Sequence, residues 1–115
     1  MRFSRSLKEN HLFRRLYRRG SSSANAFLVI YARKNGTEEN RVGITVSAKM
    51  GCAVVRNKVR RRLREIYRLN EEKFLPGYDI VVVVRSRAVT AEYDRLRKSY
   101  LSLANHMGLL KEKSS

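Results

Sequence analysis

The sequence has little of the residue types that build disulfides, metal sites and catalytic pairs. Cys52 is the only cysteine, so the chain can form no internal disulfide. The two histidines, His11 and His106, are far apart and do not have the spacing typical of a zinc site. Only 10 of the 115 residues are Asp or Glu, and they are scattered without an acidic cluster suited to magnesium. We therefore expect the protein alone to bind no metal or other cofactor.

Long apolar runs are missing as well. No run approaches the roughly 20 residues that span a bilayer, and the polar start of the chain has no apolar signal core. We therefore expect no membrane partner and a cytoplasmic protein, which the lone cysteine fits because the cytosol is reducing. No serine–histidine or cysteine–histidine pair stands out, so we expect no catalytic residue. His11 and His106 are expected at the surface, and Cys52 is expected to be a small packing residue.

Positive charge is what the chain has in excess. Lys and Arg number 26 against 10 Asp and Glu, which gives a formal net charge of +16. Such a field attracts polyanions over long range, so nucleic acid, an anionic membrane and an acidic protein are the candidate partners. The lack of membrane signals favours nucleic acid. The length and a hydrophobic content of 43% are enough for a single domain with a modest core.

The first predicted element is a basic amphipathic helix. It begins either at the capping box Ser6-Leu7-Lys8-Glu9 or at Asn10, and it runs to about Arg19 before Gly20. Its apolar side carries Leu12, Phe13, Leu16 and Tyr17, and its opposite side carries Arg14, Arg15, Arg18 and Arg19.

Two strands are predicted next, after a loop of serines at 21–23. Residues 24–33 alternate with period two and are apolar on both faces, so this strand is expected to be covered on both sides for part of its length. Residues 41–47 form the second strand, with alternate apolar residues facing inward: Val42, Ile44 and Val46. We expect the two strands to pair as an antiparallel hairpin, with an extra short strand as an option.

The second half is predicted to be helix, strand and helix. Residues 53–70 have helical periodicity, and the β-branched run within residues 78–85 is typical of a central strand. Thr90 is expected to cap a last helix that ends at Gly108.

The predicted fold class is therefore a single-domain α+β sandwich with the order α-β-β-α-β-α. Residues 41–85 permit a parallel βαβ crossover, and residues 1–5 and 109–115 are expected to be flexible ends.

The helix over residues 53–70 carries the most informative motif. Asn57, Arg61, Arg64 and Arg68 lie at i, i+4, i+7 and i+11, opposite an apolar stripe of Val55, Val59, Leu63 and Ile66. Like charges at this spacing oppose helix formation, so an external anion is expected to compensate them. Arginine suits phosphate because its planar fork makes two hydrogen bonds. The alternative is a basic face that is merely solvated.

Aromatic residues suggest a second surface. Phe13 and Tyr17 lie four apart on the basic first helix, and Tyr31 lies on the next strand. Aromatic rings framed by cations hold single-stranded nucleic acid, although spacing alone favours ordinary core packing. Lys49 and Arg85 each follow a strand and could line a cleft, or each could be only a surface charge.

Residues 41–65, which read RVGITVSAKMGCAVVRNKVRRRLRE, resemble the signature of the bacterial ribonuclease P protein component. The run Arg56-Asn57-Lys58 is similar to the family's Arg-Asn-Arg on a helix. It follows a strand similar to Val-Gly-Leu-Ser-Val-Ser and a turn similar to Lys-x-Gly. The order of elements, the first-helix aromatics before Gly20 and the strand Tyr78-Asp79-Ile80-Val81-Val82 agree as well.

This resemblance implies that a large RNA subunit, with Mg²⁺, cuts the 5′ leader from precursor tRNA, while the protein binds both RNAs and no DNA. The implied contacts with the RNA subunit are Arg56, Asn57, Lys58, Arg60, Arg61, Arg64 and Arg68. The implied contacts with the leader are Phe13, Tyr17, Tyr31, Ser47, Lys49 and Arg85. The implied fold is similar to a ribosomal-protein domain with a left-handed βαβ crossover, whereas the general rule favours a right-handed one.

Some positions depart from the family pattern. Lys58 stands where arginine is usual, which keeps the charge and loses the fork. Ala48 and Cys52 stand where polar or basic residues are common, and Tyr17 stands where phenylalanine is frequent. Without the resemblance, a ribosomal protein or assembly factor fits the composition equally well. A helix-based DNA-binding regulator fits less well, because no helix-turn-helix precedes residues 54–70.

Overall fold

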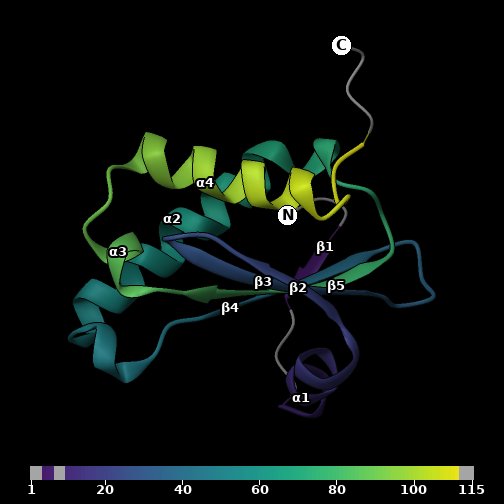
Figure 1. Ribbon diagram of the computed structural model, residues 1–115, viewed down its shortest axis with the longest axis horizontal. Coiled ribbons are helices and arrows are strands. Elements are labelled where there is room, and N and C mark those ends of the chain that lie inside the picture. Colours follow the sequence, from purple (N-terminus) through teal and green to yellow (C-terminus); the bar gives the residue numbers. More distant parts are fainter. Residues whose placement is uncertain (1–3, 7–9, 112–115) are drawn as a thin grey trace.

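The computed structural model describes residues 4–6 and 10–111, in which a five-stranded sheet lies between two helical layers (Figure 1). The strand order is β1-β4-β5-β3-β2. The strands are β1 (Ser4–Ser6), β2 (Ser21–Ala24), β3 (Leu28–Lys34), β4 (Asn40–Thr45) and β5 (Tyr78–Val84). The helices are α1 (Asn10–Arg19), α2 (Ala53–Asn70), α3 (Ser86–Val89) and α4 (Tyr93–His106), with 3₁₀ turns η1 (Ala48–Met50) and η2 (Glu71–Lys73). Helix α1 lies on one side of the sheet, and α2 and α4 lie on the other.

The α+β class and the order of the six predicted elements are confirmed, but the predicted hairpin is wrong. Strands β3 and β4 do not pair, because β5 lies between them. Strand β5 is antiparallel to β3, with Leu28 opposite Val84, and parallel to β4, with Val42 opposite Ile80. The β-branched run of β5 is apolar on both faces and is buried at the centre of the sheet. The β4–α2–β5 connection is the expected βαβ crossover.

Three short elements were not located from the sequence, although the prediction includes an extra short strand as an option. Strand β1 pairs in parallel with β4, β2 pairs antiparallel with β3, and α3 follows β5. The serines of β1 and β2 carry no apolar alternation, so only their pairing partners specify these edge strands. The capping box falls partly on residues 7–9, which lie outside the described residues, and the described helix begins at Asn10.

The two ends, which are expected from the sequence to be flexible, make pairing contacts where the structure describes them. Ser4–Ser6 pairs with β4, and Leu109 is only 2% exposed. Leu110 forms a β-bridge with Phe74, and the backbone N–H of Lys111 donates to Lys73. Residues 112–115 lie outside the described part.

The start of the last helix also differs from the prediction. Glu92, and not Thr90, precedes the first turn of α4, and the N–H of Leu96 donates to the carbonyl of Glu92. Thr90 instead ends the short helix α3. The predicted end is confirmed, because Gly108 follows the helix with a φ of 75° that favours glycine.

The core is divided by the sheet into a large and a small cluster. The large cluster packs α2 and α4 on the sheet through residues such as Leu28, Ile30, Leu63 and Tyr100. The small cluster lies under α1, where buried Leu16 and Val81 are surrounded by partly buried Phe13, Tyr31 and Val83. The expected coverage of β3 on both faces is therefore confirmed.

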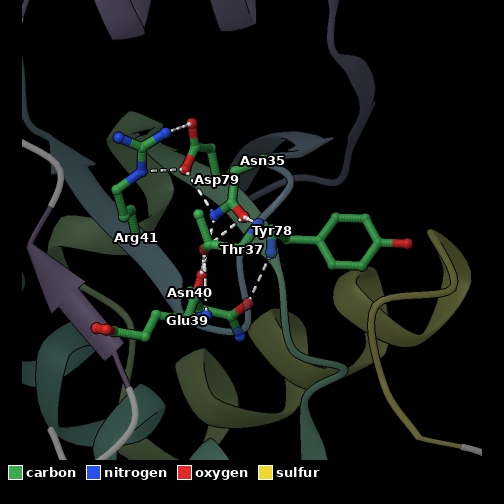
Figure 2. A network of polar contacts seen from close by, with 7 residues as sticks. All are labelled: Asn35, Thr37, Glu39, Asn40, Arg41, Tyr78 and Asp79. Carbon is green, nitrogen blue, oxygen red and sulfur yellow. Dashed lines mark hydrogen bonds and ion pairs between the residues drawn. The ribbon is translucent and has the colours of Figure 1, made fainter.

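A polar network fixes the end of the sheet at which β3 turns into β4 (Figure 2). Nε and Nη2 of Arg41 donate to the two carboxylate oxygens of Asp79 at 2.6 and 2.7 Å. The side-chain amide of Asn35 donates to the same carboxylate at 3.1 Å. The backbone N–H of Tyr78 donates to the buried side chain of Asn40 at 2.8 Å. These bonds connect the β3–β4 turn to the start of β5, so the carboxylate of Asp79 serves the fold.

Candidate nucleic-acid interface

Helix α2 presents an apolar face to the core and a basic face to solvent. Val59, Leu63 and Ile66 are at most 1% exposed. The predicted stripe on the opposite face, consisting of Asn57, Arg61, Arg64 and Arg68, is exposed at every position. The helical spacing predicted from the sequence is therefore confirmed, and a rigid helix holds the basic side chains at fixed intervals.

The remaining members of the basic set are positioned by the start of the helix. The Nε of Arg56 donates to the carbonyl of Gly51 at 3.1 Å, and Nη1 of Arg60 donates to Oδ1 of Asn57 at 2.8 Å. Lys58 is exposed. These bonds limit the rotamers of the half-buried Arg56 and Arg60, which lowers the entropy that a bound anion has to overcome.

Arg62 belongs to the same run but has a different role. Its Nη1 donates to the carbonyl of Ala91 at 3.2 Å and so holds the segment between α3 and α4 against α2. The half-buried guanidinium therefore stabilises the fold, which agrees with its absence from the predicted contacts.

The aromatic residues of the predicted leader set come together beneath α1. Phe13 and Tyr31 are half-buried against Leu16 and Val81. Tyr17 is 44% exposed, and its ring meets that of Tyr31 edge to face with centroids 4.8 Å apart. Phe13 therefore packs in the small cluster, as the core-packing interpretation predicts, while Tyr17 presents its ring to solvent and binding of nucleic acid there stays a prediction.

Two other predicted leader contacts, Ser47 and Arg85, lie at one edge of the same sheet face. Strands β4 and β5 are parallel, with Thr45 opposite Val83, so their carboxyl ends meet at one edge. Strand alternation places Ser47 and Arg85, each two residues further on, on the face that α1 covers. Lys49 and Arg85 are exposed.

Local hydrogen bonds orient these strand-end residues. The Oγ of Ser47 accepts from the backbone N–H of Lys49 at 3.3 Å, where the η1 turn begins. Nη1 of Arg85 donates to the carbonyl of Asn25 at 2.9 Å. Ser47 and Arg85 therefore lie at the edge of the sheet face that also carries Tyr31, and Lys49 lies in the adjoining η1 turn.

Cys52 does not pack as predicted. It is exposed at the residue before the first turn of α2, because the chain leaves the η1 turn at the surface there. The backbone N–H groups of Val55 and Val54 lower the pKa of its thiol. His106 is exposed as predicted, and the side chain of His11 lies outside the described part.

Within residues 4–6 and 10–111, no helix is long and apolar enough to cross a membrane. The same residues contain no group of three or more His, Cys, Asp or Glu side chains placed to hold a metal ion.

A family model described as Ribonuclease P matches residues 1–108, which is nearly the whole chain. The chain belongs to the ribonuclease P protein family. A ribonuclease P protein component from Alkaliphilus oremlandii is 45% identical over 104 residues, which cover 90% of this chain and 91% of that one. The corresponding protein of Clostridioides difficile is 47% identical over 101 residues, covering 87% and 89% of the two chains.

Solved structures of this family have the same fold. The Staphylococcus aureus ribonuclease P protein superposes with a TM-score of 0.87 at 31% identity and covers 94% of this chain and 99% of that one. The Thermotoga maritima protein superposes with a TM-score of 0.82 at 33% identity and covers 88% and 96%. Membership of this family associates the chain with tRNA processing by ribonuclease P. The match to the family model spans α1, the sheet and α2.

Proposed function

We propose that this chain is the protein subunit of ribonuclease P, binding the catalytic RNA subunit through α2 and the 5′ leader of precursor tRNA beside α1. The observation that carries the proposal is the exposed stripe of Asn57, Arg61, Arg64 and Arg68 on a helix whose other face is fixed in the core. The net charge of +16 and this rigid basic face are suited to binding the phosphate backbone of a folded RNA.

The protein's part in the reaction is binding and electrostatics, and the RNA subunit carries the chemistry. Two RNAs that approach each other repel through their phosphates, and the basic protein offsets this repulsion. Mg²⁺ belongs to the RNA-catalysed cleavage, which leaves a 5′ phosphate on mature tRNA, and the protein alone binds no cofactor. The proposed place of action is the cytoplasm, with neither DNA nor a membrane as partner.

The leader is proposed to lie along the α1 face of the sheet. Tyr17 and Tyr31 offer ring surfaces on which an unpaired base can stack, which is worth about 1–3 kcal/mol per base. Phe13 supports these rings from the small cluster. Ser47, Lys49 and Arg85 supply donors to leader phosphates and riboses at the carboxyl edge of β4 and β5.

Cleavage of precursor tRNA at low magnesium tests the proposal. Three reactions are compared: ribonuclease P RNA alone, the protein alone, and the two together. Only the mixture should cut, because the protein substitutes for part of the magnesium that screens the phosphates. Cleavage by protein free of RNA would contradict the assigned division of roles. No stimulation of the RNA by the protein would contradict the subunit role and direct the search to ribosomal RNA.

A further inference from the structure

Four arginines that belong to neither proposed contact set surround one hollow. A pocket of about 490 Å³ between α1 and β3 is lined, among the residues that the structure describes, by Arg15, Arg18, Arg19 and Arg33. Arg15 lies three and four residues before Arg18 and Arg19, so the three side chains are neighbours on one side of α1. Arg33 comes from a different element, so the tertiary fold assembles the pocket.

The pocket adjoins the aromatic surface but is made of other residues, since Arg33 lies two residues after Tyr31 on the same face of β3. At 100° per residue, Arg15 and Arg19 lie about 160° around α1 from Tyr17. The residues proposed to hold the leader therefore leave these guanidinium groups unused.

No carboxylate neutralises the group within the described part of the chain. Arg41 and Arg97 form ion pairs with Asp79 and Asp94, each with an N–O distance of 2.6 Å, but none of the four pocket arginines pairs with a carboxylate of residues 4–6 or 10–111. Asp79 lies opposite Arg33 in the strand register, yet Arg41 occupies both of its carboxylate oxygens.

Folding alone does not account for this arrangement. Arg18 and Arg19 lie in the last turn of α1, where cations interact favourably with the helix dipole. That effect does not extend to Arg15 or to Arg33 on the strand. Like charges three or four residues apart destabilise a helix by a few tenths of a kcal/mol per pair. An anion held between several guanidinium forks reverses the sign of these interactions.

We propose that this four-arginine pocket binds backbone phosphate of RNA, as an anion site made of residues outside both the α2 set and the leader set. The proposal rests on the proposed function only in naming RNA as the source of the phosphate. The RNA subunit and the precursor tRNA both supply this chemistry, so separate binding measurements distinguish them.

Inorganic pyrophosphate serves as the direct probe, followed through the arginine Nε–H resonances in NMR spectra of the full chain. The wild type should show saturable shifts at the four pocket arginines. The variant R18Q/R33Q should lose the shifts of Arg15 and Arg19. The control K73Q/K111Q removes two exposed lysine charges elsewhere and should keep all four shifts. Absence of shifts in the wild type, or unchanged shifts in R18Q/R33Q, would overturn the proposal.

Two RNA measurements then identify the source. Binding of ribonuclease P RNA to the protein, and of precursor tRNA to the assembled holoenzyme, are each titrated against salt. R18Q/R33Q should reduce the slope of log K against log salt by about 0.7–0.9 for each phosphate that is no longer neutralised, relative to K73Q/K111Q. A smaller slope in the first measurement assigns the site to the RNA subunit, and a smaller slope only in the second assigns it to the precursor. Slopes equal to those of the control in both would overturn the proposal.

A second variant pair separates this site from misfolding and from the proposed function. R15Q/R19Q changes only exposed side chains, so it should reproduce the result of R18Q/R33Q without the half-buried Arg33. R61Q/R64Q alters α2 and leaves the pocket intact. If R61Q/R64Q does not weaken RNA-subunit binding, the proposed role of α2 is wrong, while the pyrophosphate titration still decides whether the pocket binds phosphate.

Discussion

At the scale of single residues, buried hydroxyl groups distinguish two tyrosines of the core. Tyr100 is fully buried, burial raises the pKa of its phenol, and its hydroxyl has no hydrogen-bond partner among the described residues. Tyr67 is equally buried, but its hydroxyl accepts from Nδ2 of Asn40 at 3.1 Å. Removal of the hydroxyl oxygen is therefore expected to change the free energy of unfolding in opposite directions at the two positions.

Tyr100→Phe should raise the free energy of unfolding by about 1 kcal/mol, since an unsatisfied buried polar group costs about 1–3 kcal/mol. Tyr67→Phe is the matched control and should lower it by about 1 kcal/mol, because it leaves Asn40 with an unpaired donor. Urea unfolding at neutral pH measures both. An equal loss of stability in the two variants would show that the Tyr100 hydroxyl has a partner.

Phe13 and Tyr17 also differ in what each contributes. Tyr17→Ala should weaken binding of precursor tRNA relative to mature tRNA by about 1–3 kcal/mol, because one stacking surface is removed, with little effect on unfolding. Phe13→Ala should weaken the same preference and also lower the melting temperature, because the ring packs against Leu16 and Val81. Holoenzyme affinities for the two tRNAs check the preference. Equal weakening for both tRNAs would restrict these rings to a packing role.

At the scale of elements, the arginines of α2 have two different roles. Arg61 and Arg64 face solvent, whereas Arg62 bonds to the segment between α3 and α4. Arg61→Gln with Arg64→Gln should weaken assembly with ribonuclease P RNA and reduce the salt slope by about 0.7–0.9 for each phosphate that the helix no longer neutralises. Arg62→Gln is the control from the same helix. It breaks the bond to Ala91 and should lower stability without changing the slope. The prediction fails if Arg62→Gln reduces the slope as much as the double variant does.

The elements that could be predicted from the sequence are those with a local periodic signal. Helices α1 and α2 and strand β5 have clear periodicity or β-branched runs, and their bounds agree with prediction to within a residue, with α1 beginning at Asn10, one of its two predicted starts. The prediction failed for β1 and β2, whose serines acquire strand geometry only by pairing with β4 and β3. It also failed for the hairpin, since insertion of β5 depends on contacts between residues far apart in the sequence.

The candidate sites likewise divide into those that local spacing predicts and those that depend on the tertiary fold. The face of α2 could be predicted because helical spacing alone places its residues. The gathering of Ser47 and Arg85 with Tyr31 depends on the parallel pairing of β4 with β5, so the resemblance, and not the spacing, indicated it. The four-arginine pocket was missed because Arg33 joins α1 only through the tertiary fold, although Arg15, Arg18 and Arg19 already marked one side of the helix.

At the scale of the whole molecule, the net charge of +16 sets stability as well as binding. Self-repulsion destabilises the compact state, and salt screens exposed charges over about 8–10 Å at physiological strength. The melting temperature should therefore rise with sodium chloride between low and physiological ionic strength. Sodium pyrophosphate at equal ionic strength should raise it further, because an anion that binds the native arginine sites stabilises the fold by mass action.

Comparison with two charge variants separates screening from binding. K73Q/K111Q should have a smaller response to chloride, because its net charge is lower by two, and should retain the additional effect of pyrophosphate. R18Q/R33Q has the same reduction in charge and should lose part of that additional effect. Calorimetric melting of the three proteins in the two salts measures both contributions. Equal melting temperatures in chloride and pyrophosphate would mean that screening alone stabilises this basic surface and that its arginine sites have no affinity for phosphate.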